Sequence, residues 1–339
     1  MPAAARTGLP DIAAAHMHGI LRFGCGVTTA LVTGEAFGWH PTFLAAILTA
    51  TLLASLPSAL PIKAGITLVL VQTGGAFAAF AISSLLRDTP FVLFGAIGLI
   101  IFLSFATIAR GRGFLPVLLV LICFSTIPIV VMVSPQQAEA LPFAFARAMA
   151  IAVAVVWLMH ALWPRLVAKG PAAATSNLAA PVPMALAGTA IVLPLMLLYL
   201  MFGLTDALPV LITTVVLVVN FDRKRGAAQG LAMMIGNFFG GMIALLCSAL
   251  LQIAPSLAAL TLITLIMALL FAQRMERGGS GAAVGLITLN QAIIMFSLSL
   301  MPGSSPGIWA SRLLQFAIAC AFAIGMMILL LPRGTPRIR

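Results

Sequence analysis

Charged residues are the scarcest class in this sequence. Of its 339 residues only 7% are charged and 62% are hydrophobic, whereas a soluble domain carries about 25% charged residues. Residues 226–273 contain no charge at all, and a run of that length can supply two membrane spans. The composition excludes an ordinary soluble globular protein and predicts an all-α polytopic membrane protein.

Groups suited to catalysis or metal binding are also few. His16 and His18 are two residues apart, so they diverge on a helix. Residues 303–307 match G-x-S-x-G, but they lie between predicted spans rather than in a strand–turn–helix. The four cysteines stand singly in apolar stretches, namely Cys25, Cys123, Cys247 and Cys320. We therefore expect no enzyme activity, no metal and no cofactor.

Apolar segments bounded by Pro, Gly or charge predict about twelve membrane spans. A linker at 166–183 divides them into a six-span repeat at 1–165 and a second at 184–333, and a basic tail at 334–339 follows. The short segments 41–60 and 206–221 are candidates for tilted or re-entrant elements. The predicted spans are 17–37, 41–60, 63–86, 90–109, 114–133, 145–165, 184–203, 206–221, 227–253, 255–272, 281–300 and 310–331.

The basic residues favour one side of these spans. With both termini inside, 15 of the 18 Lys and Arg residues fall on the inner side, which is the bias that cytoplasmic loops show. The net charge of +11 therefore reflects membrane topology, and we expect no nucleic-acid partner. The expected location is a bacterial inner membrane, with both termini in the cytoplasm.

The two halves align at an offset of about 166 residues, so that Gly74 and Gly75 fall on Gly240 and Gly241. An even number of spans per half gives both halves the same orientation. We therefore predict two parallel six-helix repeats, related by a pseudo-two-fold axis along the membrane normal. These four glycines and Gly236 are expected to let neighbouring helices approach closely.

Two arginines oppose the charge bias. Arg147 and Arg312 fall on the outer side, 165 residues apart, and each follows an aromatic-containing segment that includes Phe145 or Trp309. Guanidinium groups beside aromatic rings suit the carboxylate of an aromatic acid. The alternative is a pair of interfacial anchors. We predict all four residues as substrate-binding residues.

Polar residues inside the predicted spans are sparse. Gln72 and Asn237 are 165 residues apart and occupy the third span of each half, and Thr28, Thr29, Asn290 and Gln291 also stand out. Such amides either hydrogen-bond one helix to another or line a translocation path. We add Gln72 and Asn237 to the predicted substrate site.

Three titratable residues cluster at the outer ends of the first spans of each half: Glu35, His40 and Asp206. They are candidates for proton exchange in a driven transporter. The alternative is that they are ordinary loop residues in the headgroup region.

The third span of the second half opens with Arg225-Gly and continues with Gly236 and Gly240-Gly241, and the second span contains a proline. Together with the two parallel halves, this pattern resembles the fusaric acid resistance / aromatic acid exporter (FUSC-like) superfamily. The resemblance implies efflux of aromatic carboxylic acids, often beside a periplasmic adaptor of the membrane-fusion type. Typical members carry cytoplasmic domains after each half, so we expect a compact subgroup that lacks them. Plant aluminium-activated malate channels are similar in the membrane part.

We therefore predict an inner-membrane efflux permease for aromatic or amphipathic organic acids and related toxic compounds, driven by the proton gradient. Its expected partners are membrane lipid, a small organic anion and a periplasmic adaptor protein. Two alternatives stay open. A passive organic-anion channel would carry current without proton coupling, and a membrane scaffold subunit would transport nothing.

Overall fold

The structure is a computed structural model that describes residues 12–56, 59–111, 113–164, 181–203, 226–277 and 280–300, with short stretches within 211–215 and 314–329. These residues contain helices and no strand, so the predicted all-α class is confirmed for this part of the chain. The helices are α1 (Ile12–Ala36), α2 (Phe43–Ser55), α3 (Ile62–Leu85), α4 (Pro90–Ala109), α5 (Phe114–Val133), α6 (Pro135–Ala138), α7 (Leu141–Leu162), α8 (Pro181–Met201), α10 (Gly226–Ile253), α11 (Leu257–Glu276) and α12 (Ser280–Ser299).

Six helical segments of the described residues are long and apolar enough to cross a membrane: Ile62–Leu85, Pro90–Ala109, Phe114–Val133, Pro135–Leu162, Met234–Ile253 and Leu257–Glu276. Three shorter apolar helices accompany them, at Phe43–Ser55, Ala185–Met201 and Val284–Ser299. The chain is therefore a multi-pass helical membrane protein. The expected spans at 206–221 and 310–331 lie largely outside the described residues.

Glycine and proline mark several of the helix ends. Gly111 and Gly113 adopt positive φ angles of 73° and 56° in the turn between α4 and α5, a backbone region that favours glycine. Pro90 begins α4, where its missing N–H costs no helical hydrogen bond. Pro142 lies within the first turn of α7. Helix α7 therefore begins at Leu141, four residues before the predicted boundary at 145.

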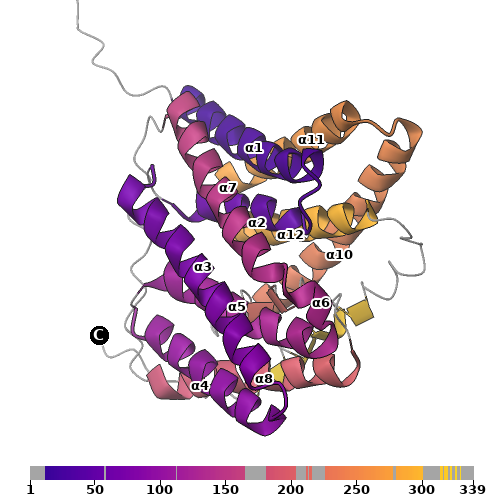
Figure 1. Cartoon of the computed structure of the whole chain (residues 1–339). Coiled ribbons are helices and arrows are strands. Elements are labelled where there is room, and N and C mark those ends of the chain that lie inside the picture. Colours follow the sequence, from indigo (N-terminus) through magenta and orange to yellow (C-terminus); the bar gives the residue numbers. More distant parts are fainter. Residues whose placement is uncertain are drawn as a thin grey trace, which may run out of the picture.

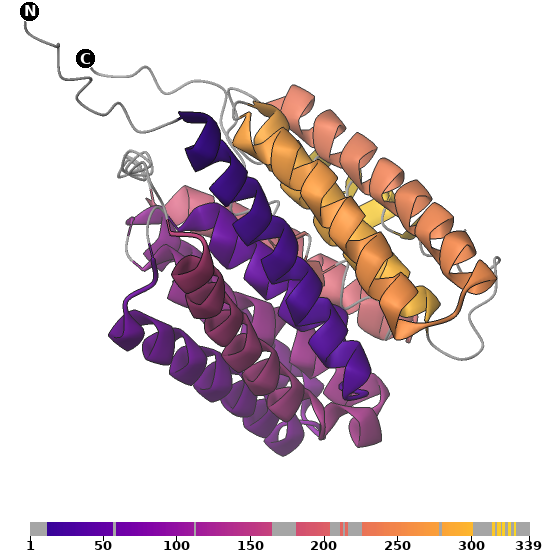
Figure 2. The same cartoon turned by 90° about the horizontal axis from the view of Figure 1, so that it is seen from above.

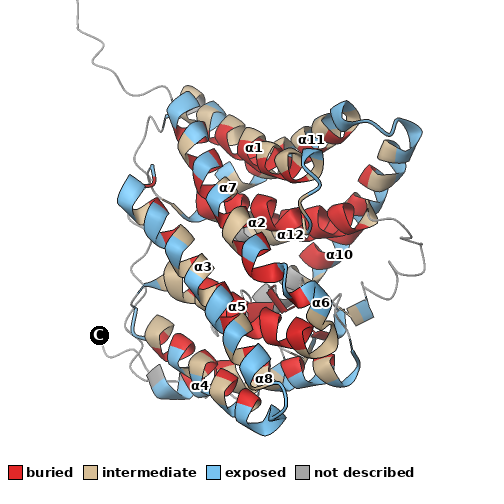
Figure 3. Ribbon diagram, in the orientation of Figure 1, coloured by how far each residue is buried: buried red, intermediate tan, exposed pale blue. Residues whose placement is uncertain are grey.

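Helix α2 corrects the prediction of a span at 41–60. It has only 13 residues, which gives a length of about 20 Å against a hydrocarbon core of about 30 Å. It stops at Ser55 because Leu56 is extended, with ψ 126°, as expected for a residue that precedes a proline. Ten of its residues are buried, and Figure 3 shows it as a red helix at the centre of the molecule. α2 is thus a core helix covered by protein.

The helices pack around α2. It contacts α1, α7 and α12, while α3 packs on α5 and α7. Seen from above, α10, α11 and α12 lie together on one side, α3 to α7 lie on the other, and α1 runs between them (Figure 2). We call the two ends of this bundle the Trp39 end, where α1 meets α2, and the Trp163 end, where α7 terminates.

Two helix pairs that are distant in sequence lie on opposite sides of the molecule: α1 with α11, and α4 with α8 (Figure 1). In each pair the two helices approach closely where one of them has a glycine. A Cβ built at Gly24 of α1 would lie 2.5 Å from Leu269 of α11, and one at Gly98 of α4 would lie 2.9 Å from Leu193 of α8. Small residues at these positions let the backbones come together.

The glycines predicted to pack helices differ in their surroundings. A Cβ at Gly240 of α10 would lie 2.5 Å from the backbone oxygen of Thr288 in α12, and one at Gly236 would lie 2.8 Å from the Thr288 hydroxyl. Gly241 is buried, and Gly75 has ordinary contacts with α5, the nearest at 3.5 Å. Gly74 is the exception, because no described atom lies within 4 Å of a Cβ placed there. It faces away from the helix contact that the sequence suggested.

Candidate functional site

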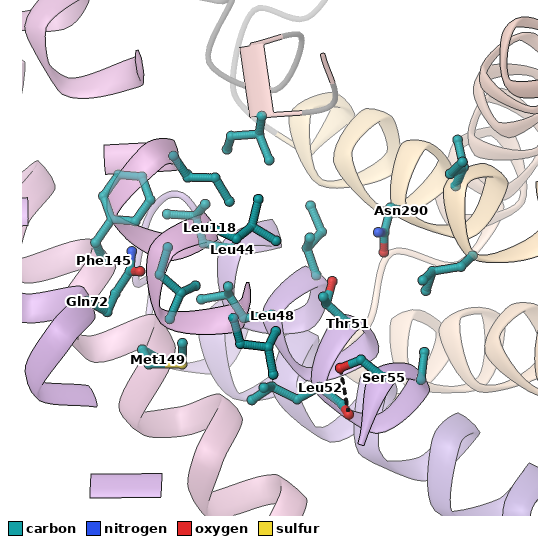
Figure 4. Close-up of a pocket in the computed structure, with 18 of the residues that line it drawn as sticks. Leu44, Leu48, Thr51, Leu52, Ser55, Gln72, Leu118, Phe145, Met149 and Asn290 are labelled. Carbon is teal, nitrogen blue, oxygen red and sulfur yellow. Dashed lines mark hydrogen bonds between the residues drawn. The ribbon is translucent and has the colours of Figure 1, made fainter. Parts of the chain in front are cut away.

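A cavity of about 240 Å³ lies beside α2. Helices α3, α5 and α7 line it on one side, and helices α10 and α12 line it on the other. Figure 4 shows Gln72 beside Phe145 on one side, Asn290 on the opposite side, and Thr51 and Ser55 on α2 between them. The full lining comprises Leu44, Ile47, Leu48, Thr51, Leu52, Ala54, Ser55, Gln72, Phe114, Leu115, Leu118, Leu119, Ile122, Phe145, Met149, Ile212, Asn237, Leu286, Ile287, Asn290 and Ile294.

The wall of this cavity is almost wholly apolar. None of the described residues that line it is charged or titratable. Their polar groups are two hydroxyls and three carboxamides, from Thr51, Ser55, Gln72, Asn237 and Asn290. A mainly hydrophobic pocket with a few convergent polar groups is the usual form of a small-molecule site. The cavity is thus the strongest candidate for a binding site in the described part of the chain.

Gln72 is the best-defined polar group of the cavity. It is 1% exposed, and its side-chain Nε2 donates to the Cys123 sulfur at 3.4 Å. The Cys123 thiol in turn donates to the backbone oxygen of Gln72 at 3.9 Å. The Gln72 Oε1 is buried without a hydrogen-bond partner among the described residues. A buried amide oxygen in this state favours an incoming donor.

Three of the predicted substrate residues line the cavity together: Gln72, Asn237 and Phe145. Asn290 stood out in the sequence and also lies in the wall, whereas sequence reasoning did not single out Thr51 or Ser55. Serine and threonine carry no such signal, because their hydroxyls can bond the carbonyl of their own helix. The Ser55 hydroxyl donates to the Leu52 carbonyl at 3.4 Å in this way.

Arg147 does not line the cavity. Its guanidinium lies 4.9 Å from the centroid of the Trp39 ring, a cation–π distance, and donates to the His40 carbonyl at 3.4 Å. Phe145 is two positions earlier on α7 and so occupies a different helix face. Phe143 is exposed and packs edge-on against Phe77, with ring centroids 5.1 Å apart. The predicted grouping of Arg147 with Phe145 is therefore split between the Trp39 end and the cavity.

Glu35 takes part in a hydrogen-bonded link at the Trp39 end. The Thr42 hydroxyl donates to Glu35 Oε1 at 2.6 Å and also contacts the Ser297 hydroxyl. Because Thr42 has a single hydroxyl hydrogen, Ser297 is the donor in the second contact. The link joins α1, the start of α2 and α12. The side chain of His40 is exposed, and only its carbonyl enters this region.

Three other predicted site residues lie outside the described residues: Arg312, Trp309 and Asp206. The predicted pair of arginines and the predicted trio of titratable groups are therefore represented here by Arg147, Glu35 and His40 alone.

A buried cation at the Trp163 end has a structural explanation. Arg22 of α1 is 6% exposed and donates to the Trp163 carbonyl at 3.0 Å, while His18 Nδ1 donates to the Pro164 carbonyl at 3.2 Å. Both groups thus meet carbonyls at the C-terminal end of α7, where the helix dipole favours positive charge. This cluster ties α1 to α7 at the Trp163 end.

The fold and cavity define a multi-pass helical membrane protein of a transporter-like kind. Residues 19–159 match the model of a family described as a protein of unknown function (DUF2955). The matched stretch begins in α1 and ends within α7, so it includes Gln72, Phe145 and Arg147. No curated protein and no solved structure matches the chain. The resemblance to aromatic acid exporters remains a prediction.

Proposed function

We propose that the chain is a membrane transporter that exports aromatic or amphipathic organic acids. The observation that carries this proposal is the uncharged cavity of about 240 Å³ against the buried helix α2. A void in the protein interior normally loses packing contacts, and this one combines apolar walls with carboxamides from α3, α10 and α12. Such a wall suits an apolar body that carries a small polar group.

The proposed architecture is two parallel repeats of six spans, and the helix contacts support it. Subtracting 166 from the bounds of α12 gives 114–133, the bounds of α5, and the same shift relates α11 to α4, α10 to α3 and α8 to α1. Under this correspondence α1 with α11 matches α8 with α4, and α3 with α5 matches α10 with α12. Reciprocal contacts of this kind are what a two-fold axis produces.

The proposed orientation has both termini in the cytoplasm of a bacterium, so that the Trp39 end faces the periplasm. Arg147 then lies at the exit side of the path, beside Trp39, and Glu35 and His40 at the same end are the proposed groups for proton exchange. As in the aromatic acid exporters, a periplasmic adaptor would receive the substrate at this end. The proton gradient is the proposed energy source.

Purified protein in liposomes tests this function. We expect an imposed pH gradient to drive accumulation of a labelled aromatic acid, and a protonophore to abolish it, with empty liposomes as the baseline. Current without proton coupling would favour the passive channel. The absence of flux in liposomes, together with normal folding, would favour the scaffold role and contradict the transporter.

Arg147 provides a prediction at the exit side. Arg147→Gln removes the charge that faces Trp39, and we expect export to fall by about twofold to fivefold, since a cation–π contact at an exposed site contributes about 0.5–1 kcal/mol. Arg147→Lys should retain part of the activity, because a lysine keeps the charge but not the planar fork. Export by the Gln variant at the wild-type rate, with normal insertion, would make Arg147 an interfacial anchor.

A further inference from the structure

Two of the polar residues in the cavity wall hold a buried acceptor that has no partner among the described residues. Gln72 Oε1 and Asn290 Oδ1 are both buried without a hydrogen-bond partner among the described residues, and both side chains belong to the lining (Figure 4). A buried acceptor of this kind costs free energy until a donor reaches it. An occupant of the cavity is therefore favoured when it brings an N–H or O–H group.

The orientation of the Gln72 amide follows from its neighbour. The Cys123 thiol hydrogen is directed to the backbone oxygen of Gln72, which leaves the sulfur as an acceptor. Only the NH₂ end of the Gln72 side chain can then bond that sulfur, as it does at 3.4 Å. The oxygen end is consequently the one that remains for a ligand.

Among the described residues, the wall of the cavity also lacks a group that would compensate an ion. No Lys, Arg or His belongs to its lining, and Arg147 contacts Trp39 and the His40 carbonyl at the Trp39 end instead. Moving an isolated carboxylate into an apolar site is strongly unfavourable. A carboxylate also offers acceptors alone, so it cannot donate to the unpaired oxygens of Gln72 and Asn290.

We infer that this cavity binds its occupant in an uncharged form, as a single ring or similar apolar body with a hydrogen-bond donor that Gln72 and Asn290 accept. The inference rests on the proposed function and specifies its substrate class. An engineered cavity of about 150 Å³ binds benzene, so about 240 Å³ has room for one substituted ring. A phenol, a primary amide or a protonated carboxylic acid fits this description.

For a carboxylic acid, the proton then enters the cavity on the substrate itself. The acid HA occupies the site as a neutral molecule and separates into A⁻ and H⁺ only where it meets water beyond the cavity. No titratable side chain is needed in the wall, and the described residues of the lining include none.

Three probes with the same ring test this inference: benzamide, which is neutral and carries a donor; methyl benzoate, which is neutral without one; and benzoate, which is an anion. Binding is measured by equilibrium dialysis on the purified full chain in lipid nanodiscs, with empty nanodiscs as the baseline. At neutral pH we expect benzamide to bind most tightly and benzoate to bind least. Apparent benzoate binding should rise about tenfold for each unit of acidification above the pKa of the acid, in proportion to its protonated fraction.

The matched variants are Gln72→Leu and Gln291→Leu. Gln291 is also a buried amide without a hydrogen-bond partner among the described residues, but it does not line the cavity. Gln72→Leu should weaken benzamide by about fivefold and leave methyl benzoate nearly unchanged, because one neutral hydrogen bond is lost. Gln291→Leu should change neither. If Gln72→Leu does not assemble, Asn290→Leu takes its place.

The inference is overturned if benzoate binds as tightly as benzamide at neutral pH, if no probe binds above the baseline, or if Gln72→Leu weakens all three probes equally. The wild-type order of the three probes decides the matter even without a folded variant. Binding in nanodiscs is separate from flux in liposomes. The expected order without flux would support the inference and contradict the proposed transporter.

Discussion

Gly240→Leu is expected to remove most of the folded protein. A Cβ at this position would lie 2.5 Å from the Thr288 backbone oxygen and 3.1 Å from the Ala292 backbone nitrogen. No rotamer change can relieve a contact with backbone atoms, so α10 and α12 must separate. Overpacking of a close interface typically costs about 1–3 kcal/mol and occasionally more, and we expect the upper part of that range. Size-exclusion profiles and thermal unfolding in detergent measure the loss.

Gly74→Leu is the matched control, at the position that corresponds to Gly240 in the first half. It has the same chemistry on α3, where no described atom lies within 4 Å of the added Cβ, and leucine is the better helix former. We expect wild-type yield and stability. Equal damage from both substitutions would mean that leucine harms insertion in general, and equal tolerance would contradict the close approach of α10 and α12.

The second large effect is expected from filling the cavity. Thr51 lies on α2 and lines the cavity (Figure 4), so Thr51→Trp would place an indole ring in the space proposed for the substrate. Export in the liposome assay should fall at least tenfold. For substrate binding, a tenfold loss corresponds to about 1.4 kcal/mol of binding free energy. Folding should largely persist, because the new ring enters an existing void rather than a packed contact.

Two controls separate blockage from misfolding. Thr67→Trp makes the same change on an exposed position of α3, where aromatic side chains are tolerated against lipid, and it should export normally. Thr51→Val preserves the size of the side chain and should also retain most of the flux. Wild-type export by a folded Thr51→Trp protein would show that the substrate takes another path.

Hydropathy predicted the long helices well and the short central one poorly. The expected spans at 63–86, 90–109 and 114–133 agree within one residue with α3, α4 and α5, because a helix that crosses the bilayer needs uninterrupted apolar length. The same criterion fails for α2, which contacts protein on most of its surface. A buried helix can be shorter than the bilayer, and apolar residues alone do not reveal this.

The site was predictable where a residue is out of place in a membrane span. Gln72 and Asn237 were identified because carboxamides are rare there, and both line the cavity. Arg147 was identified by the same reasoning, yet its partners are Trp39 and the His40 carbonyl. Which way a polar side chain points depends on helix packing. The cavity itself arises from the ends and offsets of helices, which no local pattern encodes.

The short length of α2 also affects how the protein can be assembled. A segment of 13 residues with ten buried positions is too short to partition stably into lipid as an independent span. Thr42, the residue before α2, is hydrogen-bonded to Ser297 across 255 positions of sequence, so α12 must emerge from the ribosome before α2 can reach its final surroundings. We therefore expect α2 to settle late, after the longer helices have entered the bilayer and formed the space that it occupies. A chain truncated before α12 would leave this segment without the neighbour that completes its cover.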